Sequence, residues 1–332
     1  HNLFIFKIYT MKYFTSVNDI KSVDMLVQEA LNIKKNPYVF SDLGKNKTIG
    51  LLFLNPSLRT RISTQKAAIN LGMNVIVMNV NGDSWALELE DGAVMNGSSV
   101  EHIKDAAAVL GQYCDIIGIR CFPGLQDRQA DYSEKLLKSL IKYAQVPVLS
   151  LESATLHPLQ SLADVITIKE SWKSKEKPNI VLTWAPHIKP LPQAVANSFS
   201  EWIGEIDANF TIAQPKGYEL HESYTKGARI TNNQEEALQN ADFVYVKNWS
   251  SYADYGQMPP VEGDWLLTKE KMALSNKAKI MHCLPVRRNV VLSDELLDSP
   301  NALVQEQAGN RLYAAQAVLK TMLELHYPVL HI

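Results

Sequence analysis

The sequence predicts an α/β protein with two doubly wound parallel-sheet domains and a C-terminal helix. Short runs rich in Val, Ile and Leu alternate with longer segments whose apolar residues recur at helical spacing, which is typical of βαβ units. About nine such short runs in 332 residues suit two sheets better than one. The expected boundary follows the fourth run, so the predicted domains span residues 11–153 and 154–326.

Each predicted strand is a short apolar run, because a parallel sheet covered by helices is buried on both faces. Each predicted helix is a longer segment with apolar residues on one face. In chain order, the first domain is expected to contain a helix at 17–35, a strand at 49–54, a helix at 60–71, a strand at 74–78, a helix at 100–113, a strand at 115–119, a helix at 133–143 and a strand at 147–151.

The second domain is predicted on the same grounds, and the turn-rich aromatic stretch 249–264 is expected to be a long surface loop. Its last helix is expected to pack back on the first domain. In chain order, the expected elements are a helix at 158–173, a strand at 180–183, a helix at 192–203, a strand at 210–213, a helix at 234–241, a strand at 242–247, a helix at 269–274, a strand at 279–282, a helix at 293–297, a strand at 302–304 and the C-terminal helix at 307–325.

The composition indicates a globular protein and excludes several classes of partner. Hydrophobic residues make up 46% and charged residues 20% of the chain, which argues against disorder. The 33 basic and 35 acidic side chains give a net charge of −2, so neither nucleic acid nor an anionic membrane is an expected partner. Any anionic substrate must therefore meet a local concentration of positive charge.

The three cysteines form no closely spaced pair, which fits a reducing, cytoplasmic environment and disfavours a disulfide framework or a structural zinc site. No apolar stretch approaches the roughly 20 residues needed to span a bilayer. The ten residues before Met11 contain a short apolar run without a cleavage site of small residues. We expect them to be an upstream extension outside the fold rather than a secretory signal.

The segment NPSLRTR at 55–61 is the most informative local pattern. It follows a predicted buried strand and starts a predicted helix, with Pro56 and Ser57 as candidate capping residues. A helix start presents unpaired backbone N–H groups and positive partial charge, to which Arg59 and Arg61 add bidentate donors. The segment therefore predicts a phosphate site without a glycine-rich loop. The alternative is an ordinary capped helix whose two arginines face solvent.

Ligands of open parallel sheets bind beyond the carboxyl ends of the strands, so the residues that follow each predicted strand are site candidates. Most of these positions hold a cation or a hydrogen-bonding group. Helix starts commonly carry polar caps, but so many occurrences together favour one binding site. The candidates are Ser57, Arg59, Thr60, Arg61, Arg120, Glu152, His157, Gln160, His187, Lys247, His282, Cys283, Arg287 and Arg288.

Four segments in this order resemble the aspartate/ornithine carbamoyltransferase family. They are SLRTR at 57–61, HPLQ at 157–160, HCLPVRR at 282–288 and GNR at 309–311, and the resemblance extends over residues 11–325. It implies transfer of a carbamoyl group from carbamoyl phosphate to an amine, with no cofactor, no metal and no covalent enzyme intermediate. The family commonly has EAENR where this chain has QAGNR, which puts the contacts beside Arg311 in doubt.

The resemblance implies a role for each matched residue. Ser57, the backbone N–H of Leu58, Arg59 and Thr60 would hold the phosphate, together with Trp85. The carbonyl oxygen would receive donors from Arg120, His157 and Thr60. The carbamoyl NH₂ would donate to Gln160 and to the backbone carbonyls of Cys283 and Leu284, and Arg311 would complete the cationic pocket. Arg120, His157, Gln160 and Thr60 are the expected catalytic residues.

Features of the second-substrate region resemble the branch of the family that carbamoylates N-acylated ornithine. The SMG-type loop of plain ornithine enzymes is missing, and TWAPH at 183–187 and KNW at 247–249 stand in its place. Glu152, His187 and Lys247 are the expected acylornithine-binding residues. Trp85 also matches this branch, in which the equivalent Trp reaches the carbamoyl phosphate site of a neighbouring subunit in a homotrimer.

Two positions favour a succinyl over an acetyl group on the ornithine. Members that use N-acetylornithine tend to carry Glu where this chain has Val100, and can carry Lys where it has Val291. A glutamate at position 100 would repel the carboxylate of a succinyl group, whereas valine would not. Arg287 or Lys189 is a possible partner for that carboxylate. N-succinyl-L-ornithine is therefore the expected acceptor, with N-acetyl-L-ornithine as the alternative.

Two other classes of protein fit the sequence less well. A dinucleotide-dependent enzyme is disfavoured because no GxGxxG follows any predicted strand. A non-catalytic subunit that binds carbamoyl phosphate is disfavoured because the four motif residues Arg59, Arg120, His157 and Arg311 are all retained. Taken alone, His157 or Trp85 would be read as a structural residue. Cys283 would need an activating base to act as a nucleophile, and only His282, on the opposite side of the strand, is close in sequence.

Overall fold

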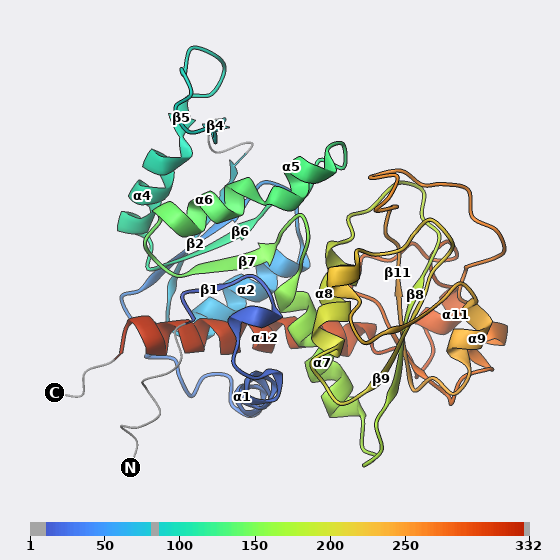
Figure 1. The fold of residues 1–332 in the computed structure, drawn as a ribbon. Coiled ribbons are helices and arrows are strands. Elements are labelled where there is room, and N and C mark those ends of the chain that lie inside the picture. Colours follow the sequence, from blue (N-terminus) through green and yellow to red (C-terminus); the bar gives the residue numbers. More distant parts are fainter. Residues whose placement is uncertain (1–10, 81–85, 329–332) are drawn as a thin grey trace.

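The protein contains two five-stranded parallel sheets in a computed structural model that describes residues 11–80 and 86–328 (Figure 1). β2 lies between β3 and β6, and β8 lies between β9 and β11, so each sheet extends in both directions from its first long strand. The predicted doubly wound fold class is confirmed. The first sheet has the order β1 (Tyr13–Phe14), β7 (Val148–Glu152), β6 (Ile116–Arg120), β2 (Thr48–Phe53), β3 (Asn74–Asn79), and the second the order β10 (Arg229–Thr231), β9 (Asn209–Ala213), β8 (Asn179–Trp184), β11 (Phe243–Lys247), β12 (Lys279–Met281).

Helices cover both faces of the sheets, which explains why the central strands are continuously apolar. β6, β7 and β11 are buried at every position, as expected for strands inside a covered parallel sheet. In Figure 1, α4 and α6 lie on one side of the first sheet, and α2 and α12 on the other. The α-helices of the described residues are α1 (Val23–Lys35), α2 (Arg59–Asn70), α4 (Ile103–Tyr113), α5 (Arg128–Ser133), α6 (Lys135–Tyr143), α7 (Pro158–Ser171), α8 (Ala194–Ile203), α9 (Gln234–Leu238), α10 (Lys269–Met272), α11 (Asp294–Leu297) and α12 (Val304–His326).

The C-terminal helix α12 joins the two halves of the molecule. It follows the second sheet in the chain but packs against α1 and α2, as well as against α7 (Figure 1). The buried amide of Asn70 on α2 donates a 3.0 Å hydrogen bond to Gln316, and the ring of His326 contacts the Met11 carbonyl at 3.0 Å. The position of α12 matters for the site because it carries Arg311 back to the first sheet.

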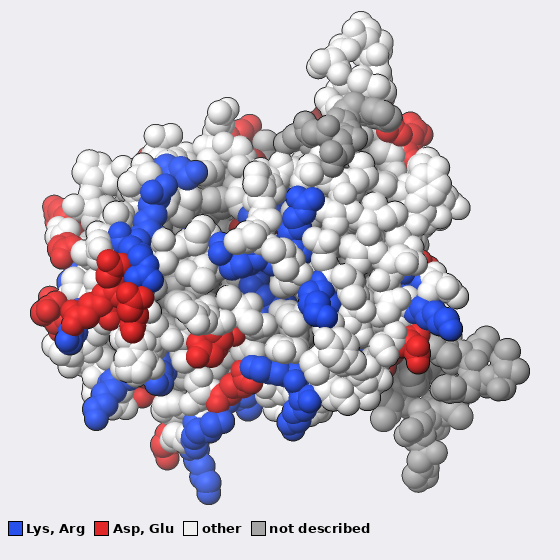
Figure 2. Space-filling view, turned by 180° about the vertical axis from the view of Figure 1, so that it is seen from behind, with Lys and Arg blue, Asp and Glu red and all other residues white. Residues whose placement is uncertain are grey.

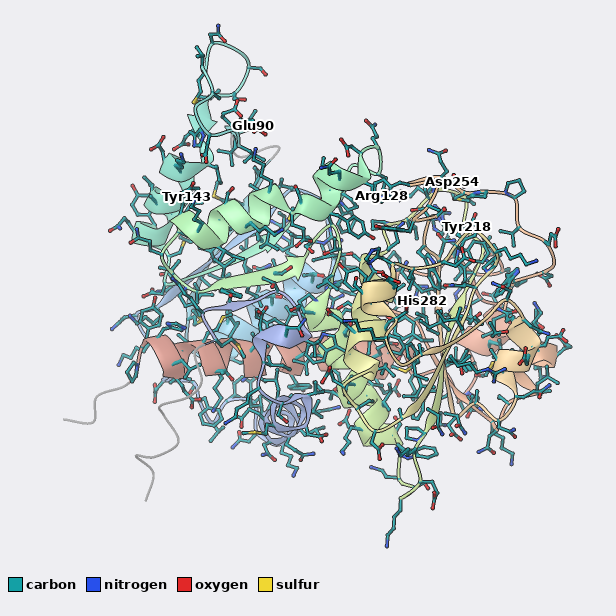
Figure 3. The ribbon with its side chains drawn as sticks, in the orientation of Figure 1. Glu90, Arg128, Tyr143, Tyr218, Asp254 and His282 are labelled. Carbon is teal, nitrogen blue, oxygen red and sulfur yellow. The ribbon has the colours of Figure 1, made fainter. Side chains whose placement is uncertain are left out.

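A second connection between the halves is made by the aromatic stretch 249–264. Arg128 of α5 donates a 2.8 Å hydrogen bond to the Tyr252 carbonyl and lies 4.5 Å over the Tyr252 ring. Figure 3 shows Arg128 beside the loop that carries Asp254. The stretch is not wholly a surface loop as predicted, because Trp249 is fully buried and donates a 2.8 Å hydrogen bond to the Tyr218 carbonyl.

Several predicted elements are corrected by the structure. The strand expected at 302–304 is wrong, because Ala302 makes only an isolated bridge to Ile280 and α12 begins at Val304. The helix expected at 17–35 is a 3₁₀ turn followed by α1, which begins after Ser22 because the Ser22 hydroxyl accepts the Met25 N–H. The helix expected at 133–143 is interrupted at Glu134, whose φ of 50° is left-handed.

Short strands are the elements that the sequence did not predict. β1 and β10 have two and three residues, and a separate pair joins β4 (Leu87–Glu88) to β5 (Glu101–His102). This pair delays the start of α4 to Ile103, since His102 becomes its cap. The predicted domain division at 153 and 154 falls between β7 and α7 and stays a prediction. None of the helices in the described ranges has the length and apolar character needed to cross a bilayer.

The close packing of α4 on the chain near Ala144 leads to a prediction about stability. A Cβ at Gly111 would lie 1.9 Å from the Ala144 carbonyl oxygen, whereas a Cβ at Gly309 would meet no atom within 4 Å. Gly111→Ala should therefore lower the free energy of unfolding by about 1–3 kcal/mol. Gly309→Ala, the matched helical control, should raise it by up to about 1 kcal/mol. Urea unfolding measures both, and equal effects would contradict the packing described.

Candidate active site

A cavity of about 1230 Å³ lies at the junction of the two sheets, beyond the carboxyl ends of β2, β6, β7 and β11. Its described lining is rich in cationic side chains, and Glu152 is the one carboxylate within it. Figure 2 shows Lys and Arg side chains near the centre of the face opposite to that of Figure 1. The basic residues that line the cavity are Arg59, Arg61, Arg120, His157, His187, Lys189, Lys247, Arg287 and Arg311.

The start of α2 forms one wall of the cavity. Ser57, Leu58, Arg59 and Thr60 line it, and Thr60 is buried. The predicted cap by Ser57 is wrong, since Leu58 is the capping residue and, among the described residues, no side-chain cap hydrogen bond is made to the first turn. The first-turn backbone donors of this helix therefore remain without a side-chain partner. An anion in this part of the cavity would be the natural acceptor.

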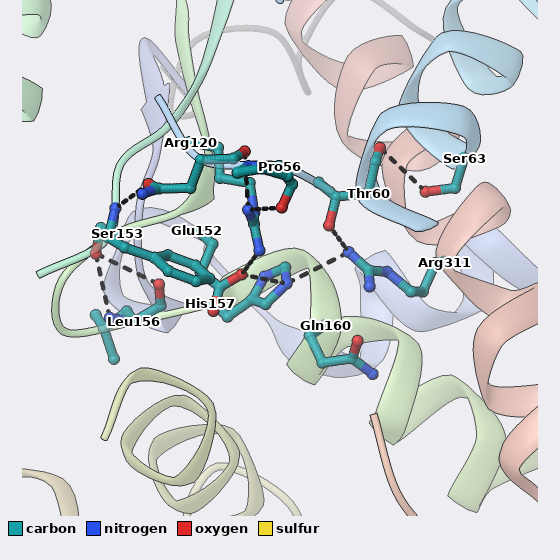
Figure 4. A network of polar contacts seen from close by, with 12 residues as sticks. Pro56, Thr60, Ser63, Arg120, Glu152, Ser153, Leu156, His157, Gln160 and Arg311 are labelled. Carbon is teal, nitrogen blue, oxygen red and sulfur yellow. Dashed lines mark hydrogen bonds and ion pairs between the residues drawn. The ribbon is translucent and has the colours of Figure 1, made fainter. Parts of the chain in front are cut away.

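A buried polar cluster brings together residues from four elements (Figure 4). Arg120, at the end of β6, donates at 3.1 Å to Glu152, at the end of β7, and at 2.5 Å to the Pro56 carbonyl. Arg311 of α12 donates to the Thr60 hydroxyl and lies 3.3 Å from Nε2 of His157. Two guanidinium groups are thus held at fixed positions by carboxylate, hydroxyl and carbonyl acceptors.

The protonation state of His157 follows from its partners. Burial, together with the charges of Arg311 and Arg120, lowers its pKa well below the ordinary histidine value. The ring is therefore neutral, and because Arg311 can only donate, Nε2 must accept and Nδ1 carries the proton. Nδ1 of His157, Nε of Arg120 and Nε of Arg311 have no hydrogen-bond partner among the described residues. The cluster thus contains donors that the protein itself leaves unsatisfied.

Glu152 forms a buried ion pair that orients Arg120. The sequence predicted a different role for Glu152, a contact with the acylornithine. Oε2 of Glu152 accepts from Arg120 and lies 3.5 Å from Nε2 of His157. Burial raises its pKa, while the charges of Arg120, Arg311 and Lys247 act in the opposite direction. Its contact with an amino-acid substrate stays a prediction.

The segment after β12 forms the opposite wall. Cys283 and Leu284 line the cavity, and the Leu284–Pro285 peptide bond is cis. Burial raises the pKa of the Cys283 thiol, so this residue is not a thiolate nucleophile at neutral pH. Oε1 of Gln160, which also lines the cavity, is buried without a partner among the described residues.

Predicted second-substrate residues lie on the side of the cavity formed by the second sheet. Lys247 ends β11 and is 8% exposed. The His187 ring lies 2.9 Å from the Lys189 carbonyl, and burial, followed by the charge of Lys247 among others, lowers the His187 pKa. Arg287 also lines the cavity, whereas Arg288 points away and pairs with acidic residues near α11.

Three predicted site residues differ from the rest in what the structure shows of them. Val100 is 65% exposed and does not line the cavity of its own chain. Trp85 lies outside the described residues. Arg61 lines the cavity but donates a 2.7 Å hydrogen bond to Asn79. No group of three His, Cys, Asp or Glu side chains within residues 11–80 and 86–328 is arranged to hold a metal ion.

Two buried residues near the site were missed by sequence reasoning. Asp164 accepts hydrogen bonds from Gln160 and from Gln307 on α12. The spacing of four residues between Gln160 and Asp164 on a predicted helix was a usable signal for the first bond. The Gln307 contact joins positions 143 residues apart and left no local signal.

The fold and the cavity define a two-domain parallel α/β protein with a cationic site between its sheets. The chain belongs to the aspartate/ornithine carbamoyltransferase family. Residues 12–170 match the family model described as the carbamoyl-P binding domain, and residues 192–322 match that of the Asp/Orn binding domain. The suspected family is confirmed.

Individual relatives cover almost the whole chain. N-succinylornithine carbamoyltransferase of Bacteroides thetaiotaomicron is 47% identical over 95% of this chain and 99% of its own. N-acetylornithine carbamoyltransferase of Xanthomonas campestris pv. campestris is 35% identical over 94% and 98%. The structure of acetylornithine transcarbamylase complexed with acetylcitrulline has a TM-score of 0.88 at 34% identity, covering 93% of this chain and 98% of that chain.

A further similar solved structure contains a succinylated amino acid. It is an N-acetyl-L-ornithine transcarbamylase mutant, with valine in place of one glutamate, complexed with carbamyl phosphate and N-succinyl-L-norvaline. Its TM-score is 0.88 at 34% identity, over 93% of this chain and 99% of that chain.

The Arg120–Glu152 pair leads to a prediction about stability. In Arg120→Met the buried Glu152 carboxylate loses its hydrogen-bonded cation, and breaking a buried pair in this way typically costs about 3–5 kcal/mol. Arg311 and Lys247 remain nearby, so we expect the lower end of that range in urea unfolding at pH 8.

The pH dependence of this penalty has a definite sign. A carboxyl group whose folded-state pKa is raised lowers stability as pH rises above its unfolded pKa, about 4.3 for glutamate. The penalty should therefore be larger at pH 8 than at pH 5. Arg120→Met/Glu152→Gln is the control and should recover most of the loss. An Arg120→Met variant as stable as the wild type at pH 8 would contradict the buried ion pair between Arg120 and Glu152.

Proposed function

We propose that this protein is a carbamoyltransferase that transfers the carbamoyl group of carbamoyl phosphate to the δ-amine of N-succinyl-L-ornithine. The products would be N-succinyl-L-citrulline and phosphate, a step that would belong to arginine biosynthesis in the cytoplasm. The observation that carries the proposal is that one cavity combines the start of α2 with Arg59, Arg120, His157 and Arg311. A small, doubly charged phosphate compound matches this arrangement of donors.

Each group of the cavity has a place in the proposed reaction. The start of α2, with Ser57, Leu58, Arg59 and Thr60, would bind the phosphate. Donors from Arg120 and His157 would meet the carbonyl oxygen, on which negative charge develops as the amine attacks. A donor of this kind typically contributes about 10²–10³ in rate. Because His157 is neutral, it can donate without adding a third buried charge to the two guanidinium groups.

The attacking nitrogen must be neutral. An alkyl amine with an ordinary pKa of about 10.4 is neutral in only about one molecule in 2,500 at pH 7. Lys247 and Arg311 would lower that pKa by charge repulsion. The amine attacks the carbamoyl carbon and a tetrahedral intermediate forms. Phosphate then leaves as its bond to that carbon breaks, and the leaving phosphate can take the amine proton. No protein general base is therefore required.

The succinyl group is favoured over acetyl by charge. Lys189 and Arg287 line the cavity, and no ion pair to a carboxylate is recorded for either among the described residues. The carboxylate of a succinyl group would be an ion-pair partner for Lys189 or Arg287. His187 and Lys247 would contact the α-carboxylate of the ornithine instead. The 47% identity to proteins named N-succinylornithine carbamoyltransferase points the same way. N-acetyl-L-ornithine is the second candidate, since proteins named for it are 35% identical.

A homotrimer would explain the placement of Val100. Val100 does not line the cavity of its own chain in the described part of the structure, so it would act in the site of a neighbouring subunit. By the family resemblance, Trp85 would reach the same neighbouring site. Exposed apolar side chains next to the edge strand β3 fit such an interface between copies. They are Leu58 at the cap of α2, Ile62 and Ile69 on α2, and Ile76 on β3.

The acceptor preference is the direct test of the proposed function. The purified protein should convert carbamoyl phosphate and N-succinyl-L-ornithine to a citrulline derivative at a kcat/KM at least about tenfold above that for N-acetyl-L-ornithine, since one lost ion pair of about 1.4 kcal/mol gives that factor. Mass spectrometry of the product measures it. A preference for N-acetyl-L-ornithine would show that it, rather than N-succinyl-L-ornithine, is the acceptor. Binding of carbamoyl phosphate without turnover of either acylated ornithine would identify a non-catalytic subunit.

Val100→Glu tests the role of position 100 in trans. A carboxylate pair about 4 Å apart costs about 4 kcal/mol at an effective dielectric constant of 20, so kcat/KM for N-succinyl-L-ornithine should fall at least about tenfold. The KM for carbamoyl phosphate should not change. Val94→Glu is the matched control, because Val94 lies in the same region of the chain and is 80% exposed. Equal losses in both variants would remove position 100 from the proposed site.

A further inference from the structure

We propose that Asp164 is a positioning residue that turns two separate hydrogen-bond acceptors toward the NH₂ group of carbamoyl phosphate. The first acceptor is Oε1 of Gln160, and the second is the backbone at Cys283 and Leu284. The inference rests on the proposed function, because it concerns how the same cavity recognises the carbamoyl group.

Asp164 lies at the centre of a buried hydrogen-bond network. Its side chain is on α7, one turn after Gln160, and is fully buried. One oxygen, Oδ1, accepts 2.7 Å hydrogen bonds from both Nε2 of Gln160 and Nε2 of Gln307. All three residues are at most 1% exposed, so water does not compete for these bonds.

The chemistry of the three groups determines how each amide is turned. An acceptor oxygen can bond only to the NH₂ end of an amide, so Gln160 and Gln307 must both direct their carbonyl oxygens away from Asp164. For Gln160 this leaves Oε1 buried at the cavity without a partner among the described residues. An unsatisfied buried acceptor is costly unless a ligand donates to it. The NH₂ of carbamoyl phosphate is such a donor.

The second arm of the network reaches the opposite wall. Oε1 of Gln307 accepts the backbone N–H of His282 at 3.0 Å. Nδ1 of His282 in turn accepts the N–H of Leu284 at 2.8 Å, which requires an unprotonated Nδ1. Burial and the charge of Lys247 lower the His282 pKa far below its ordinary value, so that state is maintained. Through Gln307 and His282, Asp164 therefore fixes the position of Cys283 and Leu284, which line the cavity and whose carbonyls would receive the NH₂ group. His282 is labelled in Figure 3.

The network does not depend on the charge of Asp164. Burial raises its pKa to about 7, but a protonated carboxyl group still accepts through one oxygen. Asn at this position would also retain one acceptor, whereas Leu has a similar size and none. These two substitutions separate hydrogen-bond positioning from packing.

Acetyl phosphate is the probe for this role, because a methyl group replaces the NH₂ of carbamoyl phosphate. The dissociation constants of the two compounds are measured by isothermal titration calorimetry, and their ratio gives the selectivity for NH₂. Asp164→Leu should lower this ratio about tenfold, the effect of one misplaced hydrogen-bond acceptor. Asp164→Asn should restore most of it. A general structural defect would instead weaken both compounds equally.

Asp242→Leu is the matched control. Asp242 is also buried and accepts from the Asn179 backbone and the Asn276 amide at 2.8 and 2.9 Å, but it does not line the cavity or join this network. Its loss should reduce stability and leave the ratio unchanged. If Asp164→Leu does not fold, Gln307→Met on α12 removes another member of the same network. This substitution should also lower the ratio.

The outcomes separate the inference from the proposed function. If the wild type binds neither compound, the proposed function fails. If the wild type binds carbamoyl phosphate more tightly than acetyl phosphate and Asp164→Leu has the same ratio of dissociation constants, only the positioning role is overturned. The same holds for Gln307→Met if it is used in place of Asp164→Leu. Equal ratios in Asp164→Leu and Asp164→Asn would also overturn it.

Discussion

The site depends on the burial of two guanidinium groups from distant parts of the chain next to a neutral histidine. Arg120 and Arg311 are 8% and 4% exposed, and one carboxylate, Glu152, lies among them. A buried cation is stable only when acceptors surround it. The described residues provide some of these acceptors and leave Nε of each arginine without one. An anionic ligand, as in the proposed function, would supply further acceptors.

The topology explains how these groups meet. The parallel strands of the first sheet deliver Arg120 and Glu152 to the same edge, because all their carboxyl ends lie there. The start of α2 lies at that edge for the same reason. Arg311 arrives by a different route, on the long helix that returns from the second sheet and packs on α2. Both halves of the molecule thus place cationic side chains around the cavity between them. Asp164 and Gln307 determine the orientation of the Gln160 amide in the cavity.

Much of the fold and part of the site could be predicted because the signals are local. Buried strands such as Thr48–Phe53 are continuous apolar runs, and Ser57–Arg61 follows one of them directly. Contacts between distant residues, such as Asp164 with Gln307, leave no pattern in the sequence. The cap of α2 was mispredicted because backbone geometry at Leu58, rather than a serine side chain, starts this helix. The place of Val100 cannot follow from one chain if a second copy completes the site.

A crystal structure with phosphonoacetamide, a stable analogue of carbamoyl phosphate, would show whether the buried cations bind this substrate. The phosphonate group should lie at the start of α2 beside Arg59, with the carbonyl oxygen within hydrogen-bond distance of Arg120 and His157 and the amide NH₂ directed at Gln160. Electron density for the analogue elsewhere, or a phosphonate group bound away from Ser57 and Arg59, would show that the cluster is not a carbamoyl phosphate site.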